Sequence, residues 1–382
     1  MPRKRLKHKE RRQMLSGVLM QKMNIAGEGV RLVLNENILA VFSDKPLRTV
    51  SSAIYNGGFK NVTAILNIQV PEGFSDSILH QRPVDFALSS SKKLGIRENF
   101  LAMITAANID NFSAVTRGKD GLAVTAIATA GCSHAETAGE EIPVQKIDGT
   151  INIIVVIDGN PTDSCLTSTL LTATEAKTAA LQSLDIRSRY SGAAATGTIT
   201  DSMVTAATGK GETIEFGGPA SKLGQLVAYC TRTAVKEAVT KQDGCMPSRS
   251  VLNRLKERKL PIERLAAGLA KASRLDMDEQ SLCALLVSKI STKPVFAAML
   301  MAAAMLNEDV DRGLIPHEFG DVESLGSSLG GMLYSRNNCS SSMSKNIDAK
   351  SSPEFCGLSS FLIRVLESLV KGELDKTAEN FK

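Results

Sequence analysis

The residues best suited to chemistry lie close together in the sequence, within residues 173–227. Glu175 and Thr178 are three residues apart, so on a helix they share a face, whereas Lys177 points nearly the opposite way. Asp201 adds a second carboxylate. Carboxylates beside a lysine can supply a general acid and a general base. We therefore expect Glu175 or Asp201 to be the general acid or base.

Three alternating threonines precede Asp201. In an extended segment the hydroxyls of Thr196, Thr198 and Thr200 would share one face, and Asp201 would lie on the opposite face. Threonines at this spacing are more often strand formers than nucleophiles. Thr198 or Thr200 as a nucleophile is therefore the lesser alternative.

Two glycine positions offer backbone N–H groups for a developing oxyanion. Gly217 and Gly218 precede a helix that Ser221 can cap, and free N–H groups at such a start attract negative charge. The backbone near Gly197 offers a second place. The plainer interpretation of Gly217-Gly218 is a turn, with Lys222 solvated.

No self-sufficient catalytic or cofactor motif is present in the sequence. It contains no HExxH, GxSxG, Walker loop or GxGxxG, and its four histidines lack metal-ligand spacing. His134 remains an alternative to Lys177 as proton donor. We assign no cofactor with certainty, and a divalent metal held by Asp201, Glu175 and His134 stays open because carboxylate and imidazole suit Zn or Mn.

The surrounding pattern predicts one α/β or α+β domain over residues 26–243, built on a mixed β-sheet with packed helices. Residues 151–158 are nearly all apolar, as in a strand buried on both faces. Asp44-Lys45-Pro46 predicts a turn between two strands. We expect strands at 30–35, 38–43, 47–56, 61–70, 100–108 and 122–131, and helices at about 84–94, 163–184 and 221–241.

The remaining residues differ in character. Residues 1–25 begin with a basic segment, and residues 244–382 form a smaller all-helical region with a Ser/Gly/Asn-rich linker at about 320–355. Between Arg249 and Arg274 there are eight Arg or Lys against two Glu, with a faint likeness to a helix-turn-helix. Solvated charged helices are commoner, which disfavours nucleic acid as a partner. A homo-oligomer stays open.

Composition indicates a globular protein of the cytoplasm. The 382 residues are 43% hydrophobic and 22% charged. The seven cysteines are scattered without a CxxC pair, which fits a reducing compartment. The most apolar stretch, 294–306, is too short for a membrane span, and no signal peptide is visible.

Seven blocks in a fixed order resemble the adenosylcobinamide amidohydrolase family. They are SSAIYNGGFKNVTAILNIQVP (51–71), MITAANI (103–109), VTAIATAGCSHA (124–135), GTINIIVVIDG (149–159), TATEAKTAAL (172–181), SGAAATGTITDS (191–202) and GGPASKLGQL (217–226). The resemblance covers roughly residues 30–240. Two departures are Ile199, where the family tends to have Gly, and His134, where Asn is common.

The resemblance implies cleavage of the amide that joins the aminopropanol arm to the corrin ring, giving adenosylcobyric acid and aminopropanol in corrinoid salvage toward coenzyme B12. A corrinoid is then the small-molecule substrate, and a non-catalytic corrinoid-binding protein is the rival. We take amide, hydroxyl, glycine and lysine positions in these blocks as substrate-binding: Asn56, Gly57, Gly58, Asn67, Thr178, Gly197, Ser202, Gly217, Gly218, Ser221 and Lys222.

Overall fold

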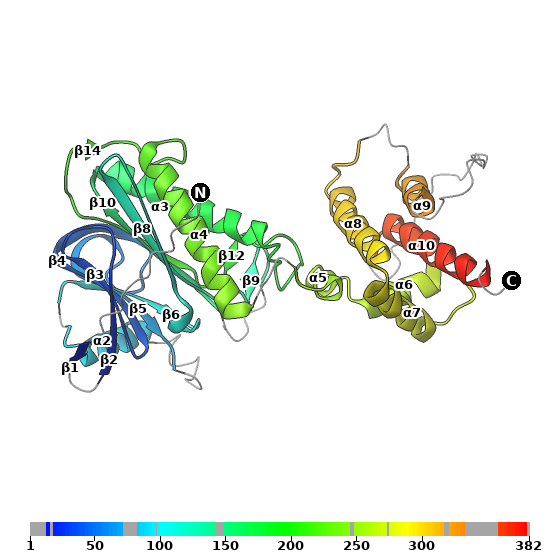
Figure 1. Cartoon of the computed structure of the whole chain (residues 1–382), viewed down its shortest axis with the longest axis horizontal. Helices are drawn as coiled ribbons and strands as arrows, with labels where there is room; N and C mark the ends of the chain where they lie inside the picture. Colours follow the sequence, from blue (N-terminus) through cyan, green and yellow to red (C-terminus); the bar gives the residue numbers. More distant parts are fainter. Residues whose placement is uncertain are drawn as a thin grey trace, which may run out of the picture. The chain divides into compact units, whose positions relative to one another are not determined.

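The computed structural model of the chain divides into two compact units, Met1–Pro247 and Ser248–Lys382, each of which is described by itself (Figure 1). The residues that the structure describes are 13–15, 18–71, 82–96, 98–142, 149–244, 248–272, 275–316, 321–332 and 358–379.

A ten-stranded mixed sheet forms the centre of the first unit. Its strands pair in the order β1–β2–β3–β4–β13–β10–β8–β7, and β5 pairs with both β4 and β6. The β10–β13 and β5–β6 pairs are parallel and the others antiparallel, which confirms the mixed sheet expected from the sequence. The strands are β1 (Gln13–Leu15), β2 (Val18–Asn24), β3 (Val30–Asn35), β4 (Ile38–Ser51), β5 (Gly58–Gln69), β6 (Phe100–Thr105), β7 (Ser113–Lys119), β8 (Leu122–Ala130), β10 (Ile151–Asp158) and β13 (Ser202–Ala207).

Strand β4 runs through the turn that the sequence predicted at Asp44-Lys45-Pro46, so that prediction was wrong. Its register with β5 shifts between Phe42 and Leu47, which leaves the turn-forming residues as a bulge inside one strand. The start of β4 pairs with β3, whereas its residues 48–51 pair with β13. β4 thereby links the two halves of the sheet, one of which contains β3, β5 and β6 and the other β13, β10, β8 and β7.

Three separate apolar cores show how the layers of this unit stack. One core joins α2 (Pro83–Lys93) to β4, β5 and β6, through residues such as Ala87 and Leu66. A second lies between the halves of the sheet and brings Ile65 together with Ile154. The third joins β8, β10 and β13 to α3 (Asp163–Ser183) and α4 (Lys222–Asp243). The result is a helix–sheet–sheet–helix arrangement.

Strand β10 lies at the middle of these layers. Ile153 and Val155 belong to the core under α3 and α4, whereas Ile154 and Val156 belong to the core between the sheet halves. The prediction of a strand buried on both faces is confirmed.

The second unit is helical, as predicted, and has its own apolar core. Part of the predicted linker is a helix, α9, so the expectation of a loop was wrong there. Gly326 of α9 explains the close packing on α10, because a Cβ at this position would lie 2.7 Å from the carbonyl oxygen of Phe361. The helices are α5 (Val251–Glu257), α6 (Ile262–Ala272), α7 (Glu279–Thr292), α8 (Pro294–Asp311), α9 (Val322–Met332) and α10 (Ser360–Glu379). The rest of the predicted linker and most of the basic N-terminal segment lie outside the described residues.

In the described part of the chain, no single helix is long and apolar enough to cross a membrane. Helices α7 and α8 meet that criterion only when taken as a pair, which is bent by 111° at the junction.

The start of α4 depends on a glycine. The α4 N-cap, Ser221, accepts a hydrogen bond from the backbone N–H of Gly224, and a Cβ on Gly224 would lie 1.8 Å from the Gly218 carbonyl oxygen. We expect Gly224→Ala to lower the free energy of unfolding by about 1–3 kcal/mol, the usual cost of overpacking. Urea unfolding measures this. Gly118→Ala is the control, because its Cβ would meet nothing closer than 3.5 Å. Equal stability of the two variants would contradict this packing.

Candidate active site

The centre of the candidate site is a buried ion pair between α3 and the segment that precedes β13. The Lys177 ammonium contacts Asp201 Oδ2, and the two side chains are only 10% and 17% exposed. Asp201 Oδ1 also accepts hydrogen bonds from the Ile151 backbone N–H at 3.0 Å and from the Thr198 hydroxyl at 2.5 Å. The Thr198 N–H lies 3.2 Å from Oδ2. With four donors, this carboxylate is close to its full capacity as an acceptor.

The segment 196–201 does not form the extended strand that the sequence suggested. Only Gly197–Thr198 is extended, as β12, and the next two residues form a turn that brings Asp201 back to Thr198. The reason is local, because an aspartate that bonds the backbone three residues earlier competes with strand geometry.

The threonine hydroxyls consequently have different partners. The Thr198 hydroxyl donates to Asp201, whereas Thr200 lies 2.6 Å from the Thr150 hydroxyl and 3.3 Å from the Gly149 carbonyl. Thr196 Oγ1 accepts from the backbone N–H of Ala138. The shared face predicted for these hydroxyls was wrong. Thr198 is 4% exposed, so its hydroxyl has little access to a substrate.

Glycine at position 197 is required by the ion pair itself. A Cβ there would lie 2.5 Å from Asp201 Oδ2 and 2.8 Å from Lys177 Nζ. Thr178, the residue after Lys177 on α3, donates a hydrogen bond from its hydroxyl to the Thr196 carbonyl at 3.1 Å. The structure therefore brings together five residues that the sequence singled out: Lys177, Thr178, Gly197, Thr198 and Asp201.

Glu136, a carboxylate that sequence reasoning missed, lies next to this ion pair. The short strand β9 (Ala135–Glu136) pairs with β12 and places Glu136 opposite Gly197. Burial raises the pKa of Glu136 above 4.5, the negative charges of Asp201 and Glu140 raise it further, and Lys177 opposes them. Within the described residues, no side chain donates a hydrogen bond to it. Its position directly after the block 124–135, which contains His134 and ends in Ala135, was the one available signal.

The neighbouring Glu140 is shifted in the opposite direction. Burial alone would raise its pKa, but hydrogen bonds from Ser188 and Ser191, with a further one from Thr137, lower it below 4.5. The Ser188 hydroxyl lies 2.6 Å from Glu140 Oε2. Two carboxyls of one loop thus differ in proton affinity because only one of them receives hydroxyl donors.

His134 is buried beside β9, with Tyr190 and Arg189 on its two ring nitrogens. Nδ1 lies 3.4 Å from the Tyr190 hydroxyl and Nε2 lies 3.3 Å from an Arg189 guanidinium nitrogen. Arginine can only donate, so Nε2 is the acceptor in this contact. His134 therefore adjoins the site with both nitrogens engaged.

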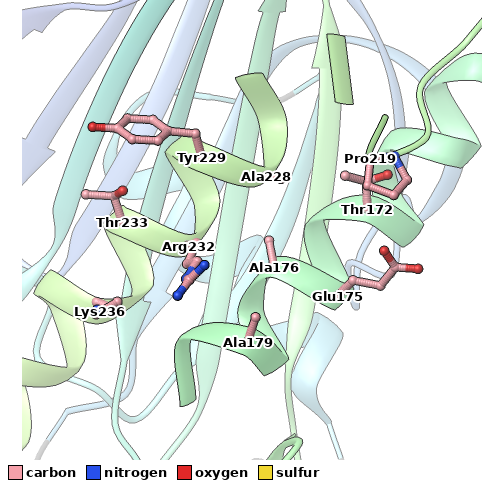
Figure 2. Close-up of a pocket in the computed structure, with 10 residues that line it drawn as sticks. All are labelled: Thr172, Glu175, Ala176, Ala179, Pro219, Ala228, Tyr229, Arg232, Thr233 and Lys236. Atoms are coloured by element: carbon pink, nitrogen blue, oxygen red, sulfur yellow. The ribbon is translucent and has the colours of Figure 1, made fainter. Parts of the chain in front are cut away.

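Glu175 lies on another side of α3. It is exposed and lines an open groove of about 460 Å³ between α3 and α4, which Figure 2 shows. At 100° per residue it is about 160° around the helix from Lys177. The structure does not bring Glu175 and Asp201 to one pocket. Nor does any group of three His, Cys, Asp or Glu in the described residues have metal-site geometry, so the ligand set of Asp201, Glu175 and His134 does not converge.

The Gly217-Gly218 segment is also remote from Asp201. Gly217 packs on Cys165 and Thr169 in the first turns of α3, and Lys177 follows Thr169 by eight residues, about 12 Å along the axis. The Gly218 carbonyl accepts from the Ser221 hydroxyl, and Lys222 pairs with Asp120. Four of the predicted substrate contacts thus lie at or just before the start of α4: Gly217, Gly218, Ser221 and Lys222.

The upstream predicted contacts divide into two groups. Asn67 is 2% exposed and hydrogen-bonds Thr129 and Asn152 between the sheet halves, so it is a core residue. By contrast, Asn56 is exposed and binds the Phe100 carbonyl through its amide, in the turn that continues into Gly57 and Gly58. Ser202 directly follows Asp201 and lies 3.3 Å from the hydroxyl of Ser52. The Asn56 turn and Ser202 thus lie where β4 ends and β13 begins.

Comparison with known proteins places this geometry in context. The model of the adenosylcobinamide amidohydrolase family matches residues 21–247. An uncharacterized protein of Methanocaldococcus jannaschii is 33% identical over 208 residues, 49% of this chain and 80% of its own. Two proteins named adenosylcobinamide amidohydrolase are similar: one from Methanosarcina mazei at 32% identity (46% of this chain, 74% of its own), and one from Halobacterium salinarum at 24% (50% and 80%).

The two shifted carboxyls predict opposite effects of pH on stability. The folded state holds the Glu136 proton more tightly than the unfolded chain does, so ionising this group costs stability as pH rises above 4.5. Glu136→Gln removes that cost, and we expect a higher melting temperature than wild type at neutral pH and no difference well below 4.5.

The matched variant is Glu140→Gln. Because the pKa of Glu140 is lowered, its ionised form stabilises the fold above 4.5, and this contribution is lost as pH falls through the folded-state pKa. Glu140→Gln should therefore melt below wild type at neutral pH and approach it in acid. Melting curves from acidic to neutral pH measure both. Shifts of the same sign in the two variants would contradict the assigned environments.

Proposed function

Because the chain belongs to the adenosylcobinamide amidohydrolase family, we propose that it hydrolyses the amide between the corrin ring and the aminopropanol arm of adenosylcobinamide. The products are adenosylcobyric acid and aminopropanol, and the reaction serves corrinoid salvage toward coenzyme B12. Two relatives carry the name of this activity, and the family match covers the whole first unit from residue 21 onward.

The observation that carries the proposal is the cluster of Glu136, Lys177 and Asp201 where the central strands β10 and β13 begin. Asp201 is saturated with donors, so we assign it a positioning role: its fixed charge holds the Lys177 ammonium in place. Glu136 has a raised pKa, which suits a group that both takes and gives a proton. We assign it the role of general base and acid in place of Glu175.

The proposed reaction follows from these roles. Ionised Glu136 takes a proton from water as the oxygen attacks the amide carbonyl. Lys177 stabilises the resulting oxyanion electrostatically, as a preorganised cation in a poorly solvated site can do. Protonated Glu136 then donates to the nitrogen, the carbon–nitrogen bond breaks, and aminopropanol leaves. His134 and the Thr198 hydroxyl remain next to this centre as supporting groups, through contacts with Arg189 and Asp201.

Substitutions at the carboxylates test the assignment. We expect wild type to convert adenosylcobinamide to adenosylcobyric acid, Glu136→Gln to lose about 100-fold in turnover, and Glu175→Gln to stay within about threefold of wild type. Chromatography of the corrinoid after incubation measures product. The control for folding is a cooperative melting transition in each variant at a temperature no lower than that of wild type.

Two outcomes contradict the proposal. No product from wild type at high enzyme concentration, with and without divalent metals, would favour a non-catalytic corrinoid-binding protein. A large loss in Glu175→Gln with normal turnover in Glu136→Gln would show that the general base is Glu175, in the groove between α3 and α4.

The first unit should be active by itself. Every residue of the cluster lies before Pro247, where both the compact unit and the family match end. The cut must spare Asp243, whose carboxylate accepts from the Cys132 N–H at 2.7 Å. A chain ending at Pro247 should therefore retain measurable hydrolysis in the chromatographic assay. A truncated chain that is folded but inactive would show that the helical unit completes the site.

A further inference from the structure

The outer face of α3 and α4 carries apolar side chains that the first unit leaves in solvent. Leu171 is 61% exposed, Phe216 73% and Tyr229 48%. Leu171 lies one turn before Glu175, Tyr229 lines the same groove, and Phe216 adjoins Gly217, whose carbonyl accepts from Thr172 in the groove wall. Single exposed apolar residues are ordinary, but several around one groove indicate an interaction surface.

The floor of the groove suits close approach of another helix. It consists of small residues, among them Ala176 and Ala179 of α3 and Ala228 of α4 (Figure 2). Tyr229 stands at one margin, and the Arg117 guanidinium stacks over its ring at 4.1 Å, which restricts the ring's orientation. A partner would therefore meet a shallow channel with a preformed aromatic margin.

Charges of opposite sign line the two walls without neutralising each other. Glu175 lies on α3, and Arg232 and Lys236 lie one turn apart on α4. Among the residues described, no ion pair includes any of these three side chains. The surface thus presents one negative side chain on the α3 wall and two positive side chains on the α4 wall, flanked by apolar groups.

We propose that this face is the interface of a homodimer in which α3 of one copy lies against α4 of the other. In a two-fold interface, each contact occurs twice with the roles of the copies exchanged. A surface with an acidic wall and a basic wall is complementary to itself under that rotation, so Glu175 of each copy meets Arg232 and Lys236 of the other. Leu171, Phe216 and Tyr229 become buried around these pairs.

Charge reversal with mixing tests this arrangement on the full chain. We expect wild type to sediment at about twice 40.8 kDa. Glu175→Arg and Arg232→Glu should each weaken the dimer at least about tenfold, because each places like charges opposite one another twice. An equimolar mixture of the two variants should restore it, because opposite charges then face each other between positions 175 and 232 in both contacts, while Lys236 stays positive in each copy. Lys93→Glu on α2, which lies on the opposite side of the unit, is the control and should dimerise like wild type.

The mixing step distinguishes contacts between copies from contacts within one chain. Failure of the mixture to dimerise, with both variants folded, would overturn the proposal, as would a wild type that stays monomeric at every concentration. A dimer that survives both reversals would place the interface elsewhere and would also overturn it.

Discussion

The Asp201 carboxylate is the point where three separate segments of the first unit meet. It accepts from Lys177 on α3, from the N–H of Ile151 at the start of β10, and from Thr198 in the turn before β13. Removing one member of a buried ion pair leaves the other charge without compensation, at a typical cost of about 3–5 kcal/mol. The cost here is toward the lower end, because both side chains keep some exposure. The ion pair fixes the turn at 199–200, and that turn allows β12 to pair with β9.

The pairing of β9 with β12 in turn determines the properties of the loop carboxylates. Glu136 is placed opposite Gly197, where burial and then the like charge of Asp201 raise its pKa, and no hydroxyl donor among the described residues opposes them. Glu140, four residues later, receives hydroxyl donors from the segment around Ser188, so its pKa falls. Carboxyls whose environments push their pKa values apart are suited to different tasks. In the function we propose, Glu136 transfers the proton and Glu140 holds the loop.

The local spacing of apolar residues was sufficient to predict the helices and strands that bury an apolar face. The uniform apolar run of β10 and the three- and four-residue spacing of α3 reflect packing that each element needs regardless of its partners. The bulge in β4 was not predictable, because Asp44-Lys45-Pro46 reads as a turn, and only its pairing with β3, β5 and β13 keeps the strand continuous.

The site was predictable only in part. Lys177, Thr178, Gly197 and Asp201 were found because they fall in two adjacent blocks of polar and small residues. Glu136 was missed because its role depends on a pairing with Gly197, 61 positions away, that no local pattern encodes. Glu175 was expected to share a pocket with Asp201 but lies on another side of α3, because spacing along a helix shows which residues share a face but not which neighbours that face meets.

The pH dependence of kcat/KM for adenosylcobinamide, compared between wild type and Asp201→Asn, tests the central claim most directly. Burial and, after it, the Asp201 charge raise the pKa of Glu136, and a general base must be ionised to act, so wild-type activity should fall in acid through that pKa. Removing the Asp201 charge should move this acidic limb to lower pH, even though the maximum rate also falls. An acidic limb that stays in place or moves to higher pH would show that Glu136 is not the titrating base beside Lys177 and Asp201.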